Sequence, residues 1–260
     1  MLSIWVPVSA QERTDSDSQP EAQPRFEMEE VVVTASRQED EVRETARNVT
    51  VITADDIAQA TSNFVPDLLS REVNVNLRSF FGTDKNAGVD IRGMGETSSS
   101  NVLVLVDGFR LNSPDLAGPD FSTIPIGEIE RIEIVRGAGS VLYGSGAVGG
   151  VINIITKRGK GKPSASLYGS YGSFDSIDLR ASGGGSYRNL SLSLNADYYD
   201  TDGYRDNGGL EKKDLGIRAS YDATDFIGGD FLEGLLLSLT AGYHDDEQGF
   251  PGGVPIGDIN

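Results

Sequence analysis

The sequence predicts an α+β domain over about residues 45–158, followed from about residue 164 to 260 by antiparallel strands of a transmembrane β-barrel. Two observations carry this prediction. Before residue 158, short apolar stretches with helical spacing are interspersed with β-branched runs of strand length. After Pro163, segments of roughly ten residues alternate apolar and polar side chains, which is typical of strands that face lipid on one side.

The residue inventory excludes several kinds of chemistry. The chain has 260 residues, 40 acidic and 22 basic side chains, one histidine and no cysteine, with a net charge of −18. Without cysteine there is no disulfide framework, thiolate zinc site, iron–sulfur cluster or cysteine nucleophile, and His244 alone cannot form a histidine cluster. Phosphate backbones need a basic face, which is missing here. We therefore expect neither an enzyme nor a nucleic-acid partner.

The N-terminal residues predict export followed by a tether. Residues 1–10 contain an apolar stretch from Leu2 to Val8 and then Val8-Ser9-Ala10, the small-residue pattern of a signal-peptide cleavage site. We interpret them as the remnant of a signal peptide; the alternative is an ordinary frayed terminus. Residues 11–44 are expected to form a disordered arm, because the polar, acidic stretch up to Glu29 cannot bury enough apolar surface to order itself.

A β-branched run lies near the end of this arm. It reads Glu30-Val31-Val32-Val33-Thr34-Ala35 and favours a strand. The arm offers no neighbouring strand, so the sheet edge of a partner is a natural place for its backbone groups. The alternative is a first edge strand of the following domain.

The α+β domain begins with helix signals and continues with strands. Thr53-Ala54-Asp55-Asp56 is a capping-box pattern, and Ile57, Ala60 and Phe64 then form an apolar face at helical spacing. Pro66-Asp67-Leu68-Leu69 predicts a second short helix. Strands are expected at Val73 to Leu77, Val89 to Arg92, Val102 to Val106, Phe109 to Leu111, Ile129 to Val135 and Val151 to Thr156.

A glycine motif in this domain resembles a nucleotide-binding loop only in spacing. Gly144-Ser145-Gly146-Ala147-Val148-Gly149 has the G-x-G-x-x-G pattern. A dinucleotide loop must leave a strand and open a helix, whereas these glycines run into the strand that starts at Val151. We therefore expect no nucleotide site.

The alternation after Pro163 predicts about five strands with one apolar and one polar face. The apolar series end on Tyr171, Tyr198, Tyr221 and Tyr243, where an amphipathic ring would lie at a membrane–water boundary. A soluble sandwich with buried tyrosines is the alternative. The clearest apolar series are Leu190, Leu192, Leu194, Ala196, Tyr198; Leu215, Ile217, Ala219, Tyr221; and Leu235, Leu237, Leu239, Ala241, Tyr243.

About five strands cannot close a barrel, and an open edge in hydrocarbon leaves backbone groups without hydrogen bonds. We therefore expect an incomplete barrel whose missing strands come from a longer chain or from a second polypeptide. The loop composition of Gly249 to Pro255 agrees with a chain that is cut short.

Taken together, the motifs resemble those of TonB-dependent outer-membrane receptors, most closely the cobalamin receptor type, over about residues 30–246. The run Glu30 to Ala35 looks like a TonB box. The other matching motifs are Ile91-Arg92-Gly93; Val102-Leu103-Val104-Leu105-Val106-Asp107-Gly108; Ile132-Glu133-Ile134-Val135-Arg136-Gly137; Tyr143-Gly144-Ser145; and Gly149-Gly150-Val151-Ile152-Asn153-Ile154-Ile155-Thr156.

This resemblance implies an architecture and a mechanism. Residues 45–158 would be a plug domain inside a barrel of about 22 strands. Residues 164–260 would supply about the first five of these strands. The protein would lie in the outer membrane of a Gram-negative bacterium and take up a cobalamin or ferric-siderophore type ligand. TonB would pair with the box at residues 30–35 and pull on the plug. Arg92 and Arg136 match plug arginines that pair with carboxylates on the barrel wall; surface arginines in turns are the alternative.

Two alternatives concern function and a metal. A non-transporting plug-type interaction module, or a truncated gene product that binds only TonB or ligand, is the second functional hypothesis.

No cofactor is expected, with calcium as the one exception. An aspartate cluster near a long connection between strands could hold this ion, because hard oxygen ligands suit calcium and related receptors use it. A solvated acidic loop is the alternative. The aspartates are Asp200, Asp202, Asp206 and Asp214.

Overall fold

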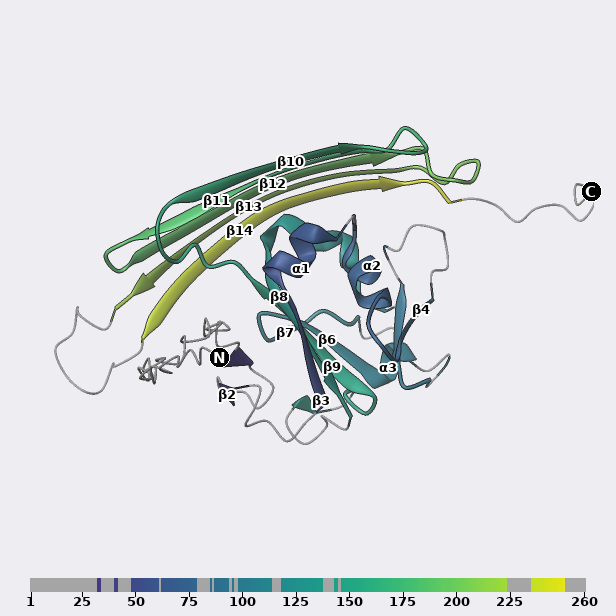
Figure 1. Cartoon of the computed structure of the whole chain (residues 1–260), viewed down its shortest axis with the longest axis horizontal. Coiled ribbons are helices and arrows are strands. Elements are labelled where there is room, and N and C mark those ends of the chain that lie inside the picture. Colours follow the sequence, from purple (N-terminus) through teal and green to yellow (C-terminus); the bar gives the residue numbers. More distant parts are fainter. Residues whose placement is uncertain are drawn as a thin grey trace, which may run out of the picture. The chain divides into compact units, whose positions relative to one another are not determined.

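The computed structural model describes residues 32–33, 40–41, 48–60, 62–78, 85, 87–93, 95, 98–113, 118–137, 143–144, 146–223 and 235–250. Its elements follow one another along the chain as short helices and strands up to residue 156 and then as five long strands (Figure 1). They are β1 (Val32–Val33), β2 (Asp40–Glu41), β3 (Asn48–Thr53), α1 (Ala54–Gln59), α2 (Val65–Ser70), β4 (Val75–Arg78), β5 (Gly88–Ile91), α3 (Ser98–Asn101), β6 (Val102–Val106), β7 (Phe109–Arg110), the 3-10 helices η3 (Phe121–Thr123) and η4 (Ile126–Glu128), β8 (Ile129–Arg136), β9 (Gly150–Thr156), β10 (Ser164–Tyr171), β11 (Ile177–Tyr187), β12 (Leu190–Thr201), β13 (Leu210–Asp222) and β14 (Leu236–Gln248).

The first domain is built on a mixed sheet with the strand order β3-β8-β9-β6-β7. Only β6 and β9 pair in parallel; the other neighbours are antiparallel. The middle strands β8, β9 and β6 are largely buried, and β6 is apolar on both faces, whereas Glu133 of β8 and Asn153 of β9 are buried polar residues. Side chains from β8 and β9 form the centre of the core with those of α2, among them Ile132, Ile134, Ile152, Ile154 and Leu69.

The predicted helix signals are confirmed at their start and corrected at their end. Thr53 caps α1, because its hydroxyl accepts from the Asp56 N–H while the Asp56 carboxylate accepts from the Thr53 N–H. However, α1 ends at Gln59. Phe64, predicted on the same helix face, instead precedes α2 as its N-cap residue, and Pro66 lies in the first turn of α2 as expected. The chain therefore uses two short helices where the apolar spacing suggested a longer first one.

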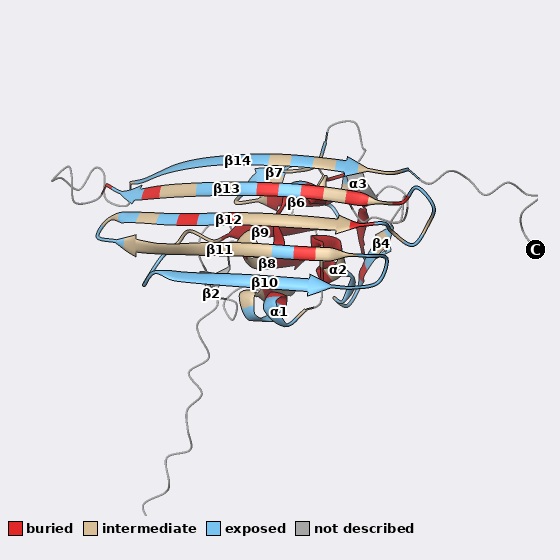
Figure 2. Cartoon of the chain, turned by 90° about the horizontal axis from the view of Figure 1, so that it is seen from above, coloured by how far each residue is buried: buried red, intermediate tan, exposed pale blue. Residues whose placement is uncertain are grey.

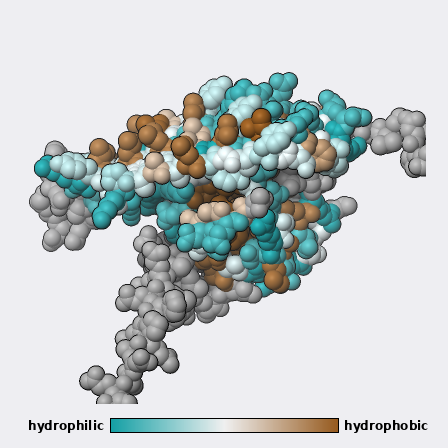
Figure 3. All heavy atoms as spheres, turned by 45° about the horizontal axis from the view of Figure 1, so that its top comes forward, coloured by the Kyte–Doolittle hydropathy of each residue, from teal (hydrophilic) through white to brown (hydrophobic). Residues whose placement is uncertain are grey.

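The second part is a five-stranded antiparallel meander, β10 to β14, which we name the outer sheet. Burial is greatest in its middle strands and least in β10 and β14 (Figure 2). On β12, Leu190 and Leu194 are about half exposed, whereas Ser193 and Asn195 are buried. The exposed apolar side chains gather on one face of this sheet (Figure 3). The described residues contain no helix long and apolar enough to cross a membrane.

The tyrosines of the exposed face lie towards two different rims of the outer sheet. Tyr198 lies towards the end of β12, whereas Tyr221 pairs with Leu190 at the beginning of that strand. Each ring ends the apolar series of its own strand, so antiparallel pairing distributes the rings between both rims. Eight residues separate Leu190 from Tyr198, or about 26 Å along a strand. That spacing is close to the apolar height of about 25 Å in outer-membrane barrels.

Gly149, the last glycine of the G-x-G-x-x-G spacing, and Gly150 allow close backbone packing at the start of β9. Gly149 accepts from the Gly137 N–H and donates to the Asn101 carbonyl, and β9 starts at the next residue. A Cβ on Gly150 would lie 2.6 Å from the Val135 carbonyl oxygen and 2.9 Å from Ile91 Cδ1. No helix follows these glycines, so the structure agrees with the rejection of a dinucleotide loop.

We expect Gly150→Ala to destabilise the chain by about 1–3 kcal/mol, because backbone and a buried isoleucine must shift to admit the methyl group. Gly172→Ala is the matched control, since the nearest atom to its Cβ would be Ser176 Cβ at 4.0 Å. Denaturant unfolding of both variants measures the difference. Equal stabilities would contradict the packing role of Gly150.

Candidate functional site

The polar face of the outer sheet lies against the α+β domain, and we name this contact the seam. Hydrogen bonds to backbone carbonyls and a ring contact run along it. The Ser193 hydroxyl donates to the Lys157 carbonyl at 3.1 Å, and the Arg180 guanidinium donates to the Ser62 carbonyl at 3.0 Å. Tyr199 meets Phe64 edge-on, with ring centres 5.2 Å apart. The seam is therefore made by side chains that the alternation turns away from the apolar face.

Asp107 links the α+β domain to the outer sheet. It lies at the tight turn between β6 and β7, with a φ of 49°. Its carboxylate accepts from the backbone N–H and hydroxyl of Thr156, at 3.0 and 2.6 Å, and pairs with Arg218 of β13 at 2.6 Å. Both partners of this pair are largely buried, with side chains 12% and 15% exposed. One carboxylate thus fixes the end of β9 and holds the sheet to the domain.

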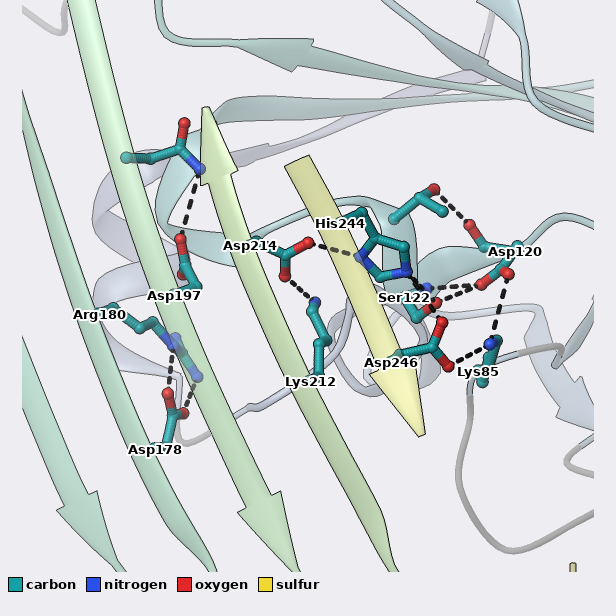
Figure 4. Close-up of polar contacts among 12 residues, drawn as sticks. Lys85, Asp120, Ser122, Asp178, Arg180, Asp197, Lys212, Asp214, His244 and Asp246 are labelled. Carbon is teal, nitrogen blue, oxygen red and sulfur yellow. Dashed lines mark hydrogen bonds and ion pairs between the residues drawn. The ribbon is translucent and has the colours of Figure 1, made fainter. Parts of the chain in front are cut away.

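A second cross-seam network surrounds His244 (Figure 4). The imidazole lies between two carboxylates, with Nδ1 2.6 Å from Asp214 Oδ1 and Nε2 3.0 Å from Asp246 Oδ1. Asp246 also pairs with Lys85 of the α+β domain. Lys212 lies 3.1 Å from Asp214 Oδ2, in an ion pair without the geometry of a directed hydrogen bond. Two lysines and the imidazole alternate with two carboxylates through this network, so each carboxylate has a polar partner in a place where burial alone would be costly.

Ser122, His244 and Asp214 have the order of a hydrolytic triad but not its geometry. Ser122 Oγ lies 3.4 Å from His244 Nε2, beyond the reach of about 2.6–3.2 Å expected for a nucleophile and its base. The hydroxyl donates instead to Asp120 at 2.6 Å, and Ser122 is fully buried. The histidine therefore has partners that the sequence did not indicate, yet they form an ion network and not a nucleophilic centre.

A half-buried acid and a half-buried base lie near the same seam. Burial raises the pKa of the Glu128 carboxyl, an effect that Arg218 opposes. Burial lowers the pKa of the Lys157 ammonium, an effect that Asp197 and nearby glutamates oppose. The Lys157 ammonium donates to the Gly127 carbonyl at 2.8 Å. At this position a neutral backbone acceptor holds the lysine, so the charged pairs of the seam are concentrated at Asp107 and around His244.

The structure places the predicted box and arginines as follows. Val32 and Val33 form β1, which pairs with Asp40 and Glu41 of β2; Glu30, Val31, Thr34 and Ala35 lie outside the described residues. The Arg136 guanidinium donates to Thr50 and lies 3.8 Å from Glu72, both within the α+β domain. Arg92 is exposed, and its guanidinium lies over Gly137. Their pairing with the barrel wall stays a prediction, because the seam pairs described here use Asp107 and Lys85.

The four predicted calcium ligands are not brought together. Asp200 pairs across the strands with Glu211, whereas Asp214 lies three residues further along β13, buried on the polar face and engaged by Lys212 and His244. Asp202 and Asp206 lie in the connection between β12 and β13. Within the described part of the chain, no group of three or more acidic or histidine side chains is arranged to hold a metal ion. Strand register turns Asp214 into the seam, away from the other three aspartates, and the calcium site stays a prediction.

We expect the Asp107–Arg218 pair to contribute about 1–3 kcal/mol of coupling energy, since its partners are linked across the seam and largely desolvated. A double-mutant cycle of Asp107→Asn and Arg218→Met, measured by urea unfolding in detergent micelles, gives this value. The exposed Glu211–Lys213 pair is the control and should give less than about 1 kcal/mol. Equal coupling at the two pairs would contradict a specific role for Asp107.

Comparison with known proteins agrees with this arrangement. Residues 41–151 match the family model of the TonB-dependent receptor plug domain. The vitamin B12 transporter BtuB of Vibrio cholerae is 42% identical over 164 residues, which are 63% of this chain and 26% of the transporter. The chain thus spans about a quarter of the length of the curated relatives that it matches. Those relatives are named as transporters and not as enzymes, as the residue inventory led us to expect.

Solved structures show the same fold. The siderophore receptor PirA from Acinetobacter baumannii is 29% identical, with a TM-score of 0.58 over 76% of this chain and 32% of that one. The ferripyoverdine receptor of Pseudomonas aeruginosa is 19% identical and shares the fold, with a TM-score of 0.69 over 83% of this chain and 27% of that one. The α+β domain therefore matches the plug domain of TonB-dependent receptors, and the plug with the outer sheet has the fold of the corresponding part of such a receptor.

Proposed function

We propose that this chain is the N-terminal part of an outer-membrane receptor that takes up a scarce ligand, of the cobalamin or ferric-siderophore type, with energy supplied through TonB. The observation that carries the proposal is the plug domain held by ion pairs against the polar face of a sheet whose other face is apolar. The matched relatives, a vitamin B12 transporter and siderophore receptors, support the ligand class.

The two faces of the outer sheet suit an outer-membrane location. Leucines and tyrosines such as Leu194 and Tyr243 are exposed on one face, where water would be an unfavourable neighbour. Lipid would cover that face, and the aromatic rings towards both rims would lie at the two membrane–water boundaries. The polar face would line the barrel interior, which the plug fills.

The contacts of the seam suit a plug that is displaced from the sheet while its own apolar core stays folded. Its described links are ion pairs, hydrogen bonds and the ring contact of Tyr199 with Phe64, in contrast to the continuous apolar core inside the plug. Polar links can be replaced by water one at a time as the plug shifts, whereas apolar core surface cannot. A pull on the arm would thus act on the seam before it disrupts the core.

The arm would supply the handle for that pull. The valine run at residues 30–35 has strand propensity, and in the structure Val32 and Val33 already form a short antiparallel pairing. A partner that adds its own strand edge would use the same backbone groups. We therefore place TonB binding at Glu30, Val31, Val32, Val33, Thr34 and Ala35 as part of the proposal.

Binding of the full chain to the periplasmic domain of a TonB protein tests this step. We expect Val33→Pro to weaken binding at least about tenfold, because proline removes a backbone N–H from the pairing strand. Ala22→Pro, in the arm outside the box, is the matched control and should bind like the unchanged chain. Surface-immobilised TonB domain and a titration of each variant give the affinities.

Equal affinities of Val33→Pro and Ala22→Pro would contradict strand pairing at the box. A chain that does not bind the TonB domain in any form would contradict energisation through this segment.

A further inference from the structure

A groove lies in the exposed apolar face of the outer sheet, between side chains of β10 and those of β13 and β14. Its volume is about 630 Å³, and its surface is almost wholly apolar. That volume is within the range of about 300–1,000 Å³ that is usual for small-molecule sites. We name it the apolar groove. The apolar side chains among its lining residues are Leu167, Leu179, Ala181, Ala196, Tyr198, Leu215 and Tyr243.

Strand register explains why the face is hollowed here. One row of directly opposed residues crosses the five strands, and residues opposed in this way point to the same face. Ala181 and Ala196 lie side by side in the middle of the row. On either side of them, Leu167 is 87% exposed, and Leu215 and Tyr243 are each 57% exposed. Two small side chains between large ones therefore leave a depression.

The groove is bordered by charge at one end. In the next row towards the end of β12, Tyr198 lies opposite Lys213, and Lys213 lies opposite Asp245. The Lys213 ammonium lies 6.0 Å from the centre of the Tyr198 ring and 2.6 Å from the Glu211 carboxylate. The surface thus passes from alanine to an aromatic ring and then to an ion pair, as it does where hydrocarbon gives way to headgroups.

These features together suit an amphiphile. The occupant must be apolar where it contacts Ala181 and Ala196, and polar where it reaches Lys213. The depression is only as deep as the difference between an alanine and a leucine side chain, so it suits a single acyl chain and not a helix about 10 Å in diameter. Because Lys213 is neutralised by Glu211, the groove selects the chain and not the charge of the headgroup.

We propose that the apolar groove holds one acyl chain of a membrane lipid, with the headgroup beside Tyr198 and Lys213. The proposal rests on the outer-membrane location proposed above and goes beyond it, because this lipid stays bound where lipid on the flat part of the face exchanges. A chain between the side walls buries more of its methylene groups than a chain on a flat surface. Each buried methylene contributes about fourfold in affinity.

The test uses the full chain, purified in a neutral detergent, and native mass spectrometry to measure bound lipid. Phosphatidylethanolamine and phosphatidylglycerol with identical saturated chains are the probes. Ala181→Leu/Ala196→Leu fills the groove and displaces about two methylene groups, so it should bind both lipids about 15-fold less tightly. The unchanged chain should bind the two lipids equally well.

The matched control is Ala219→Leu/Ala241→Leu, which makes the same change on the same face outside the groove. Ala219 lies opposite Leu192 and Leu239, and Ala241 lies opposite Ile217, so neither has an alanine beside it in its row. This variant should bind both lipids like the unchanged chain. Equal loss in the two double variants would overturn the proposal. A dimer that dissociates only in the groove variant would also overturn it, because a second copy would then be the occupant.

A second pair of variants tests the same claim without adding bulk. Leu215→Ala removes one wall of the groove and should weaken lipid binding at least about fourfold. Leu239→Ala truncates an exposed leucine outside the groove and should have no effect. Thermal unfolding of each variant shows that it is folded. Unchanged binding by a folded Leu215→Ala chain would contradict the proposal.

A separate measurement distinguishes the groove from the proposed location. The unchanged chain is mixed with vesicles of neutral lipid and extracted with alkaline carbonate. Chain that stays with the vesicles, while the groove variant and its control bind lipid equally well, overturns the groove alone. Chain that is extracted from every vesicle overturns both proposals.

Discussion

The alternation of one apolar and one polar side chain along β10 to β14 is the constraint on which the rest of the molecule depends. Because successive side chains of a strand point to opposite faces, the register of the outer sheet assigns each residue to lipid or to the plug. A shift by one residue would bring Leu194 and Ile217 against the plug and expose Arg218 and Asp214 on the apolar face. The hydrogen-bonded pairing of five strands therefore fixes the seam.

The seam satisfies charges that the sheet itself cannot pair. Arg218 forms an ion pair with Asp107, which follows β6, and Asp246 forms one with Lys85. Within the sheet, Asp214 is held between Lys212 and His244. Removing one partner would leave a charge in a poorly solvated place, so the plug and the sheet stabilise one another. In the proposed mechanism, water would replace polar links of this kind as the plug shifts.

Much of the fold could be predicted because its signals are local. The capping box at Thr53, the apolar run of β6 and the alternation of β12 each lie within a few residues. The helix end at Gln59 was missed because Phe64 falls at the right spacing for the same helix, yet its ring packs on Tyr199 of the outer sheet. That contact joins residues far apart in sequence, and no local pattern encodes it.

The seam could not be predicted either, because its contacts join residues that are far apart in sequence. The Asp107–Arg218 pair connects positions in two different domains, and the partners of His244 come from β13, β14 and η3. The structure separates Asp214 from the loop aspartates, because its register on β13 decides where its side chain points. The sequence predicts the tyrosines as boundary residues, whereas their division between two rims follows only from antiparallel pairing.

Residue-by-residue accessibility along β12 tests the central claim most directly. The chain has no cysteine, so single cysteines can be placed at each position from Leu190 to Tyr198 and spin-labelled without background. In lipid vesicles, we predict that oxygen, which concentrates in hydrocarbon, broadens the signals at Leu192, Leu194 and Ala196 but not at Ser191, Ser193 and Asn195. Signals without this period of two, or greater exposure of the leucine positions to a water-soluble nickel complex, would contradict a lipid-facing sheet.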